Sequence, residues 1–256
     1  MQRLRRLSGR RSARVQEGAF VIDGPILLRE ALRAGVRIDE VFVTTSADEV
    51  TVAAALAVGA LVHEVTPDVL ARAVDTATPQ GMAAIAGRVE VALEVAVQAA
   101  AAGPLALVLV DVGDPGNAGT LLRAAEAAGA SAVLFCGSSV DPSNAKCVRA
   151  SAGALFHVPV ASGGEAVAVL EELRRQGVRT AATVVAGGQP YDDADLTGPV
   201  AVVLGSEAHG LPEAVMALVD EHLTIPMVGR SESLNVAMAG SVLCFEALRQ
   251  RRRMGA

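Results

Sequence analysis

Three loops rich in polar side chains each lie between a run of apolar residues and a segment with helical spacing. The last of these loops, residues 229–235, follows the apolar run 223–225 and contains Ser231, Ser233 and Asn235. In open α/β sheets, ligands bind where a strand leads into a helix, because the first helical turn offers unpaired N–H groups. The loop is therefore a candidate ligand site, and an ordinary loop with a serine helix cap is the alternative.

The first polar loop, D-V-G-D-P-G-N at 111–117, ends in a turn signal. Asn117 is a candidate cap for a helix that would carry Arg123 on its second turn, as in a nucleotide-binding helix N-terminus. The loop contains neither G-x-G-x-x-G nor a Walker sequence, and Lys146 is the only lysine of the chain, which argues against dehydrogenases and nucleoside triphosphatases. Taken alone, an arginine at position 123 is more often a surface residue than a catalytic one.

The middle loop begins at Gly205, directly after the apolar run 200–204, where a residue without a Cβ permits close approach of a ligand. Glu207 and His209 follow in the same loop, ahead of a helix that Pro212 begins. A carboxylate beside an imidazole suits acid–base chemistry. No third Cys, His or carboxylate lies nearby at ligand spacing, so the loop does not predict a metal site.

The elements that must position these loops alternate between strands and helices along the chain. In the first ninety residues, strands are predicted at 19–22, 38–44, 61–65 and 82–89, helices at 25–35, 47–58 and 67–74, and a turn at 76–81. Further on, strands are predicted at 105–110, 132–136, 156–160, 180–185, 200–204 and 222–225, and helices at 118–128, 145–152, 165–176, 212–218 and from Ser233 onward. This order predicts a small α/β domain at 1–90, a partly helical linker at 91–104 and a doubly wound α/β domain at 105–256.

Charge is unevenly distributed along the 256 residues. The first 14 residues hold six arginines and no acid, while the whole chain has a net charge of −6. Such a basic arm suits a polyanion such as nucleic acid, and a solvated terminus without a partner is the alternative. The arginines of this predicted nucleic-acid-binding set are Arg3, Arg5, Arg6, Arg10, Arg11 and Arg14.

Cysteine usage and hydropathy point to a cytoplasmic protein. The three cysteines are widely spaced and form no C-x-x-C, so neither a disulfide framework nor a zinc cluster is predicted. The longest apolar run, 95–110, is interrupted and shorter than the roughly 20 residues of a membrane-spanning helix. The basic start lacks the apolar stretch of a secretory signal. We therefore expect neither a membrane nor a metal among the partners.

In order and spacing, the three loops closely resemble the motifs of the SpoU (TrmH) family of RNA ribose methyltransferases. The matching stretches are N-A-G-T-L-L-R at 117–123, L-G-S-E-A-H-G-L at 204–211 and I-P-M-V-G-R-S-E-S-L-N-V-A-M-A at 225–239. Residues 141–160 resemble the central segment of the family, and residues 12–86 resemble the substrate-binding domain that precedes the catalytic domain in members acting on ribosomal RNA. Two small departures are Asp23, where many relatives carry Glu, and Phe245, where the aromatic residue is often Tyr.

The resemblance implies a parallel sheet of the SPOUT class with a deep trefoil knot, preceded by a small α/β RNA-binding domain, and a homodimer. Composition and periodicity give no indication of a knot. The resemblance also implies S-adenosylmethionine as methyl donor, bound largely through backbone groups. Carried over by motif, the donor-binding residues are Thr183, Leu204, Gly205, Ile225, Met227, Ser233 and Leu234, and the polar active-site residues are Asn117, Arg123, Glu207, Ser233 and Asn235.

The implied reaction is 2′-O-methylation of a ribose in structured RNA, with 23S ribosomal RNA as the expected substrate. A ribose hydroxyl is a poor nucleophile and the sulfonium methyl is already activated, so the enzyme must align the two and assist loss of the hydroxyl proton. Arginine holds its proton tightly, so we expect Arg123 to grip phosphate and stabilise developing alkoxide charge, with the base left open. A tRNA ribose methyltransferase and a non-catalytic RNA-binding dimer of the same fold are the alternatives.

Overall fold

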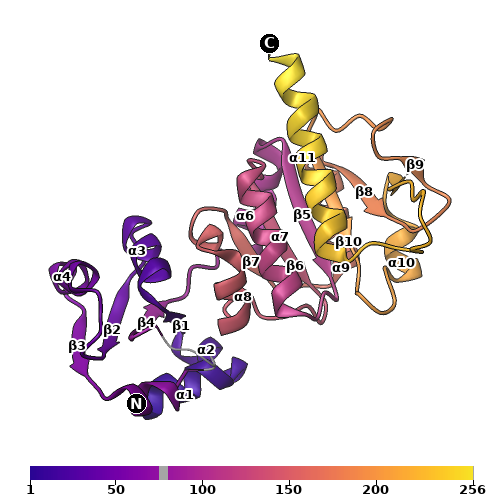
Figure 1. Cartoon of the computed structure of the whole chain (residues 1–256). Coiled ribbons are helices and arrows are strands. Elements are labelled where there is room, and N and C mark those ends of the chain that lie inside the picture. The colour runs from indigo at the N-terminus through magenta and orange to yellow at the C-terminus, as the bar shows by residue number, and fades with distance from the viewer. Residues whose placement is uncertain (75–79, 256) are drawn as a thin grey trace. The chain divides into compact units, whose positions relative to one another are not determined.

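The computed structural model describes residues 1–74 and 80–255, so the predicted turn at 76–81 lies mostly outside the described residues. These residues form two compact units (Figure 1). Unit 1 comprises Met1–Val89 with Ser143–His157, and unit 2 comprises Glu90–Pro142 with Val158–Ala256. The segment 143–157 therefore packs with unit 1, although it lies between strands of unit 2 in the sequence.

Unit 1 is built on a four-stranded sheet with the order β1-β4-β2-β3. Its strands are β1 (Ala19–Asp23), β2 (Ile38–Val43), β3 (Leu61–Glu64) and β4 (Met82–Gly87). β4 pairs antiparallel with β1 and β2, and β3 pairs parallel with β2 at the edge. The sheet is mixed because a helical crossover joins β2 to β3 and makes that pair parallel, while β4 runs antiparallel to both of its neighbours.

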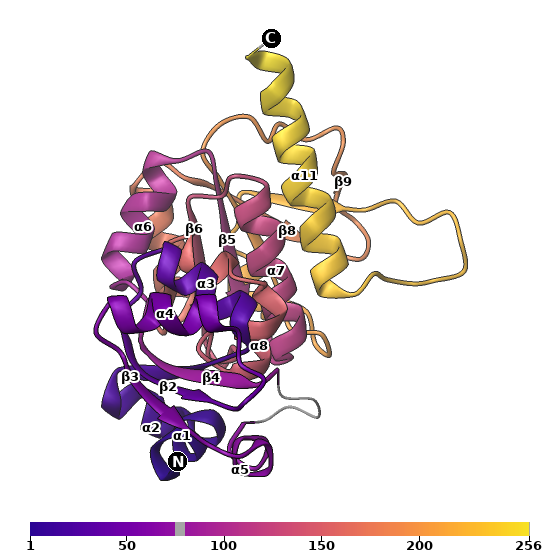
Figure 2. The same ribbon diagram turned by 60° about the vertical axis from the view of Figure 1, so that its left-hand side comes forward.

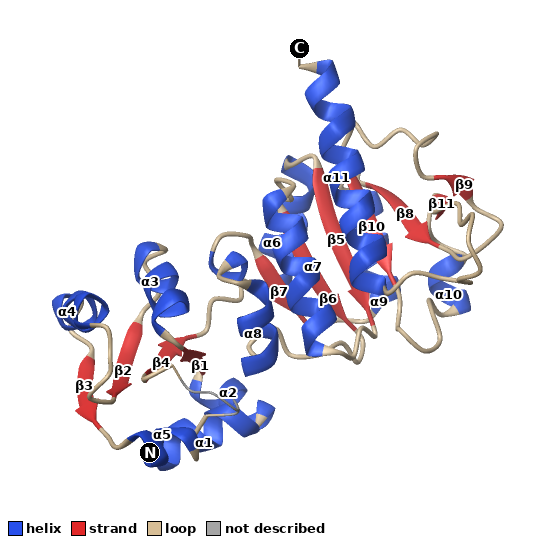
Figure 3. Ribbon diagram, viewed as in Figure 1, coloured by secondary structure: helices blue, strands red, loops and turns tan. Residues whose placement is uncertain are grey.

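Helices cover both faces of this sheet. Figure 3 shows α3 (Pro25–Arg33) and α4 (Glu49–Ala57) on one face, and α1 (Gln2–Gly9), α2 (Arg11–Glu17) and α5 (Pro67–Ala71) on the other. Leu4, Leu7 and Leu70 are fully buried against the second face. The arginine-rich start is thus folded as two helices rather than an extended arm. α8 (Ala145–Ser151) and the 3₁₀ turn η1 (Ala154–Phe156) complete the unit, with α8 against β1.

Unit 2 contains a seven-stranded sheet with the order β7-β6-β5-β10-β8-β11-β9, in which every pairing is parallel. The strands are β5 (Leu105–Val110), β6 (Ala132–Cys136), β7 (Val160–Ser162), β8 (Arg179–Thr183), β9 (Gln189–Pro190), β10 (Val200–Leu204) and β11 (Glu221–Thr224). β5, β6 and β10 are buried along their whole length, which explains their unbroken apolar sequences. β10 lies between β5 and β8, so the chain returns to the middle of the sheet after forming strands on both sides of it, and β11 then enters between β8 and β9.

Two groups of helices cover this sheet. α6 (Leu93–Ala102), α9 (Ala166–Arg175) and α10 (Glu213–Met216) share one apolar core with one face, and α7 (Pro115–Ala127) and α11 (Val236–Met254) lie side by side on the other (Figures 1 and 2). Gly240 makes this close approach possible, because a Cβ at position 240 would lie 2.2 Å from Leu121 Cδ2.

Most predicted elements are found within a few residues of their expected bounds, and one is wrong. The strand predicted at 156–160 is instead the turn η1 followed by a loop, and the strand β7 begins only at Val160. Gly153 adopts a left-handed φ of 97° and Pro159 has no N–H to donate, so an apolar stretch between them cannot extend as a ladder strand. β9 was not predicted, because two residues that include a proline carry no strand signal. Within the described residues, no helix is long and apolar enough to cross a lipid bilayer.

Candidate active site

The carboxyl ends of β5, β10 and β11 carry the three polar loops and bring them together. Because β10 lies next to β5, the loop after β10 meets the loop after β5, although some ninety positions separate them in the chain. The loop after β11 leads into α11, which packs against α7. This arrangement places Asn117 within hydrogen-bonding distance of both Glu207 and Asn235.

Glu207 joins the loop after β10 to the loop after β5. Its carboxylate accepts hydrogen bonds from the N–H groups of Gly113 (3.1 Å) and Asp114 (3.2 Å) and from Asn117 Nδ2 (2.9 Å). Partial burial disfavours the charged form, but these hydrogen bonds outweigh it and hold the pKa of Glu207 below its usual value. Glu207 is therefore ionised at neutral pH and acts as an acceptor that fixes two loops.

Asn235 joins the third loop to the same cluster. Its Nδ2 donates to Asn117 Oδ1 at 3.0 Å, while its Oδ1 accepts from the N–H groups of Ala237 and Met238 and so caps α11. Asn117 is not the helix cap that the sequence suggested. Asp114 caps α7 by accepting from the Asn117 N–H at 2.8 Å, which leaves the Asn117 side chain free to bridge Glu207 and Asn235.

A cleft of about 600 Å³ opens beside this cluster. Of the predicted donor-binding residues, all but one line it: Thr183, Gly205, Ile225, Met227, Ser233 and Leu234. Leu204 does not, because its side chain is fully buried in β10. Glu207, Ser233 and Asn235 of the polar set also line the cleft, whereas Asn117 is connected to it only through its hydrogen bonds and Arg123 is not part of its wall.

Gly205 is required by the packing of its own loop. A Cβ at this position would lie 2.4 to 2.6 Å from backbone atoms of Gly210 and Leu211, so the loop itself excludes a side chain there, and the close approach of a ligand to Gly205 stays a prediction. Ser206 and Gly210 exchange two backbone hydrogen bonds, of 3.0 and 2.9 Å, that close the turn between them. The result is a compact turn that presents Glu207, Ala208 and His209.

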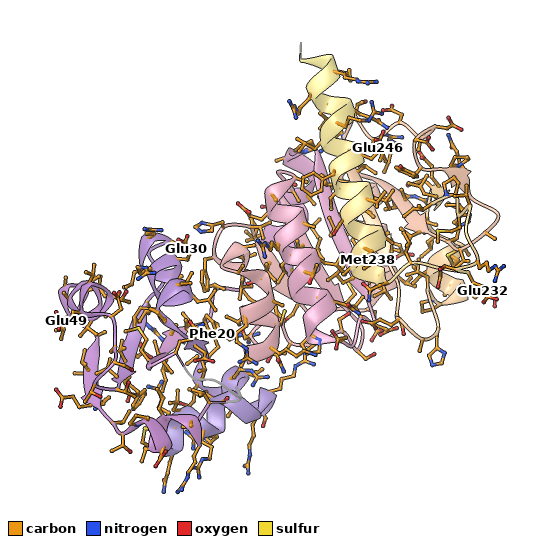
Figure 4. The ribbon with its side chains drawn as sticks, viewed as in Figure 1. Phe20, Glu30, Glu49, Glu232, Met238 and Glu246 are labelled. Carbon is orange, nitrogen blue, oxygen red and sulfur yellow. The ribbon has the colours of Figure 1, made fainter. Side chains whose placement is uncertain are left out.

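The remaining wall of the cleft suits a ligand with an aromatic base and a polar tail. No main-chain group of residues 226–234 makes a hydrogen bond within the described part of the protein, so these donors and acceptors are open to a ligand. Ile225, Leu234, Val236 and Ala239 supply apolar surface, and Ser233 adds a hydroxyl. Figure 4 shows Glu232 on the loop before α11 and Met238 on the first turn of α11. The composition fits the backbone-dominated recognition implied for S-adenosylmethionine.

Arg123 lies on α7, two turns after Asn117, and is exposed to solvent. Unlike most arginines of unit 2, it has no hydrogen-bond or ion-pair partner among residues 1–74 and 80–255. A guanidinium with no internal partner is available to a phosphate or to developing negative charge.

The six predicted RNA-binding arginines fall into two groups. Arg3 is bound by three carboxylates of its own unit, with the Glu17 contact strongest, and its pKa is raised further above the usual range. Arg14 is 3% exposed and donates to two backbone carbonyls of α1. Its side chain is therefore buried and is not available to contact RNA. The exposed members are Arg5, Arg6, Arg10 and Arg11.

Other residues of the cleft were not singled out from the sequence. Val184 and Val185 follow Thr183, and Val236 and Ala239 lie on the first turn of α11. Their position directly after a strand or at a helix start is the signal that could have found them. In the described part of the chain, no three His, Cys, Asp or Glu side chains gather in a way that could hold a metal ion.

Comparison with known proteins finds a family match in each half of the chain. Residues 104–245 match the SpoU rRNA Methylase family, and residues 1–84 match the MRM3-like substrate binding domain. The chain is 32% identical to the 23S rRNA (guanosine(2553)-2′-O)-methyltransferase RlmP of Bacillus subtilis, over 91% of this chain and 89% of that protein.

Some solved structures resemble this chain over nearly its whole length, and others resemble only part of it. The AdoMet-bound rRNA methyltransferase from Sinorhizobium meliloti has a TM-score of 0.86 and 32% identity, over 97% of this chain and 93% of that one. A structure described as giving insight into 2-OH methylation of C/U34 on tRNA has a TM-score of 0.54 and 34% identity, over 60% of this chain and 100% of that one. Since the family match covers more than half of the residues and the geometry joins all three motifs, the chain belongs to the SpoU rRNA methylase family.

Proposed function

We propose that this protein is an S-adenosylmethionine-dependent RNA (ribose-2′-O)-methyltransferase that acts on 23S ribosomal RNA. The observation that carries the proposal is the hydrogen-bonded series Asn235, Asn117 and Glu207, which joins the three family motifs at the edge of one cleft. A protein that had kept only the fold would have no reason to retain this polar series. The relative RlmP is named for the same reaction on 23S rRNA.

The donor is proposed to bind in the cleft beneath the loop 225–235. Thr183, Gly205, Ile225, Met227, Ser233 and Leu234 are proposed to hold it, with Leu204 contributing through its backbone only. When bound, S-adenosylmethionine supplies an electrophilic methyl group. The protein's part is to fix the loops that shape the cleft, which Glu207 and Asn235 do, and to orient the ribose hydroxyl.

Arg123 is proposed to bind the phosphate next to the target ribose and to stabilise negative charge that develops on the 2′-oxygen. Its exposure and its lack of a partner among the described residues support this assignment, since a guanidinium already paired with a carboxylate would be neutralised. Its place outside the cleft wall fits a contact with RNA rather than with the donor.

RNA capture is proposed to reside mainly in unit 1. Unit 1 holds 13 Lys and Arg against 10 Asp and Glu, a net charge of +3, whereas unit 2 holds 9 against 18, a net charge of −9. A polyanion is therefore attracted to unit 1 and repelled by much of unit 2. Arg5, Arg10 and Arg11 are the proposed phosphate contacts, whereas Arg6, although exposed, is already paired with Glu17.

A ribosomal substrate is favoured over tRNA by the extent of the similarities. The rRNA methyltransferase from Sinorhizobium meliloti is similar over 97% of this chain, whereas the structure concerned with tRNA is similar over 60%. The match of residues 1–84 to a substrate-binding domain further supports an RNA that needs a second contact surface.

The protein is further proposed to be a cytoplasmic homodimer with a knotted catalytic domain. Large apolar side chains are exposed on one stripe of α11, with Met238 at 61% and Phe245 at 48%, and Val228 on the preceding loop is fully exposed. Burial of these side chains against a second copy would remove an apolar surface from water. The three cysteines are free, as in a reducing compartment.

Ribose-methylation mapping of 23S and 16S rRNA tests the proposed function in the cell. We expect one 2′-O-methyl position to disappear from 23S rRNA in a strain that lacks the gene and to return when the wild-type gene is restored. An unchanged methylation map would contradict the proposed function.

A further inference from the structure

The short helix α8 turns two cations away from the body of unit 1. Its buried residues are Ala145, Cys147, Val148 and Ser151, and the helix packs against β1. Lys146, the only lysine of the chain, is exposed, and the side chain of Arg149 is 30% exposed. Residues three apart are neighbours on the surface of a helix, so the two side chains lie on the same outer face.

The segment 143–157 supplies much of the positive charge of unit 1. It contains Lys146 and Arg149 and neither Asp nor Glu. Without these two residues, the net charge of unit 1 would be +1 instead of +3. A polyanion is attracted to a surface of this kind. The phosphate contacts proposed on α1 and α2 do not use this charge, so α8 is a separate cationic surface of the same unit.

Arg149 is held in place without a hydrogen bond to a carboxylate. Its Nη1 lies 3.8 Å from Asp23 Oδ2, which is longer than a hydrogen bond, and this buried atom has no hydrogen-bond partner among the described residues. Burial raises the pKa of Asp23, against the opposing effect of the Arg149 charge, and the Asp23 side chain is only 6% exposed. The carboxylate is thus withdrawn from solvent, while the outer part of the guanidinium can donate to a phosphate.

A short stretch of chain joins α8 to the loop after β5, which leads to the first family motif. Val140 N–H donates to the Val112 carbonyl at 2.9 Å, and Ser139 Oγ accepts from Val112 N–H at 3.1 Å. Only residues 141–145 separate Val140 from Lys146. RNA bound by α8 is therefore connected through a few residues to the loop that positions the motif.

We propose that α8 binds the phosphate backbone of the RNA near the target nucleotide, with Lys146 and Arg149 as the contacts. Lysine offers a compact charge to a phosphate, and arginine offers several N–H donors in a fixed plane. Such contacts set the position of the RNA and read no base, because the phosphates of all nucleotides are alike. This inference rests on the proposed function and adds a second RNA surface to the one on α1 and α2.

The single lysine allows a test on the unaltered protein. The full chain is treated with a limiting amount of an amine-acetylating reagent, with and without an unmodified 23S rRNA transcript, and acetylation of Lys146 is measured by peptide mass spectrometry. We expect the RNA to protect Lys146 and the protection to disappear as the salt concentration rises, because phosphate contacts are salt-dependent. Acetylation without RNA at each salt concentration is the control.

Substitutions test both contacts in a binding and a transfer assay. We expect Lys146→Gln and Arg149→Gln each to flatten the slope of log affinity against log salt by about 0.7 for single-stranded RNA. Both should raise the RNA concentration needed for the half-maximal transfer rate and leave donor affinity unchanged. Arg33→Gln is the matched control, because it removes one charge from the same unit at an exposed side chain already paired with Glu30 at 2.6 Å. It should keep the wild-type slope.

The result for Lys146 decides the inference, because its side chain is exposed and its substitution leaves the packing of α8 unchanged. Unchanged acetylation of Lys146 in the presence of RNA, or equal salt slopes for Lys146→Gln and Arg33→Gln, would overturn it. If methyl transfer by the wild-type protein is observed alongside either result, this inference fails alone. If the wild-type protein transfers no methyl group to RNA, the proposed function fails and the inference fails with it.

Discussion

Asn235 Nδ2 donates a hydrogen bond to Asn117 Oδ1 at 3.0 Å across 118 positions of the sequence. The Oδ1 of Asn235 also caps α11, and Asn117 Nδ2 in turn donates a hydrogen bond to the carboxylate of Glu207. The start of the last helix is thereby coupled to the loops after β5 and β10. Different substitutions of Asn235 should therefore distinguish its role in capping α11 from its role in holding the loops together.

Aspartate at position 235 separates these two roles. Asn235→Asp keeps an oxygen that caps α11 but replaces the donor to Asn117 with a second acceptor, so we expect near-normal thermal stability and a strong loss of methyl transfer. Asn235→Ala loses both contacts and should also lose about 1 kcal/mol of unfolding free energy, as for other N-caps. Calorimetric melting and a transfer assay measure the two effects. Equal activity of Asn235→Asp and the wild type would contradict the role of this hydrogen bond.

The carboxylate of Glu207 should make stability depend on pH in the acidic range. Its pKa is lowered in the folded state, so its contribution is fully present above the ordinary glutamate pKa of about 4.3 and is lost as pH falls through the lower folded value. We expect Glu207→Gln to reduce the unfolding free energy by about 1 kcal/mol at pH 7, a modest amount because the group is exposed. Urea unfolding should show this difference from pH 6 to 8 and its progressive loss as the pH falls below about 4. A difference that stays constant down to pH 3 would contradict the pKa shift.

Gly240 should not tolerate a side chain, because α11 and α7 are in close contact there. A Cβ would meet Leu121 Cδ2 at 2.2 Å and Leu204 Cδ1 at 2.8 Å. Overpacking of this kind costs about 1–3 kcal/mol, against a gain in helix propensity of about 1 kcal/mol. Gly240→Ala is therefore expected to be destabilising in thermal melts, and Leu121→Val should restore part of the loss.

Gly9→Ala is the matched control for this substitution. Gly9 ends α1, and nothing lies within 4 Å of a Cβ built there, so we expect an unchanged or slightly higher melting temperature. If Gly240→Ala and Gly9→Ala behave alike, the packing of α11 on α7 is looser than described.

RNA affinity should depend on salt through the exposed arginines of α1 and α2. Each phosphate contact to single-stranded RNA contributes about −0.7 to the slope of log affinity against log salt, so Arg5→Ala, Arg10→Ala and Arg11→Ala combined should flatten the slope by about two units. These side chains are exposed, so the fold should be retained. The buried Arg14 is left unchanged.

Fluorescence anisotropy with a labelled 23S rRNA fragment measures this slope. Arg174→Ala with Arg175→Ala, on the acidic unit 2, is the control and should leave the slope unchanged. An unchanged slope in the triple variant would place RNA binding on another surface.

Most strands and helices could be predicted from the sequence because their signals are local. Residues 105–110 and 200–204 are unbroken apolar runs, and both are strands buried along their length. Local signals failed where the conformation depends on neighbours in space. The apolar stretch after Gly153 forms a 3₁₀ turn because that glycine takes a left-handed conformation, and the two residues of β9 are a strand only because β11 lies beside them.

The sequence predicted which residues belong to the candidate site better than it predicted which groups those residues contact. Motif order selected Glu207 and Asn235, but strand order decides which groups they meet, and periodicity does not give strand order. Only the position of β10 beside β5 brings Glu207 to the N–H groups of Gly113 and Asp114. For the same reason the sequence assigned the cap of α7 to Asn117 instead of Asp114, since both residue types are common caps.

The most direct test of the central claim is the identity of the methylated nucleoside. The purified full chain is incubated with tritium-labelled S-adenosylmethionine and an unmodified 23S rRNA transcript, and the RNA is digested to nucleosides and separated by chromatography. We predict that the label elutes as one 2′-O-methylnucleoside, and that Arg123→Ala reduces it by about 100-fold or more with donor affinity unchanged. Label in a base-methylated nucleoside, or no label in RNA with the wild-type protein, would contradict the account.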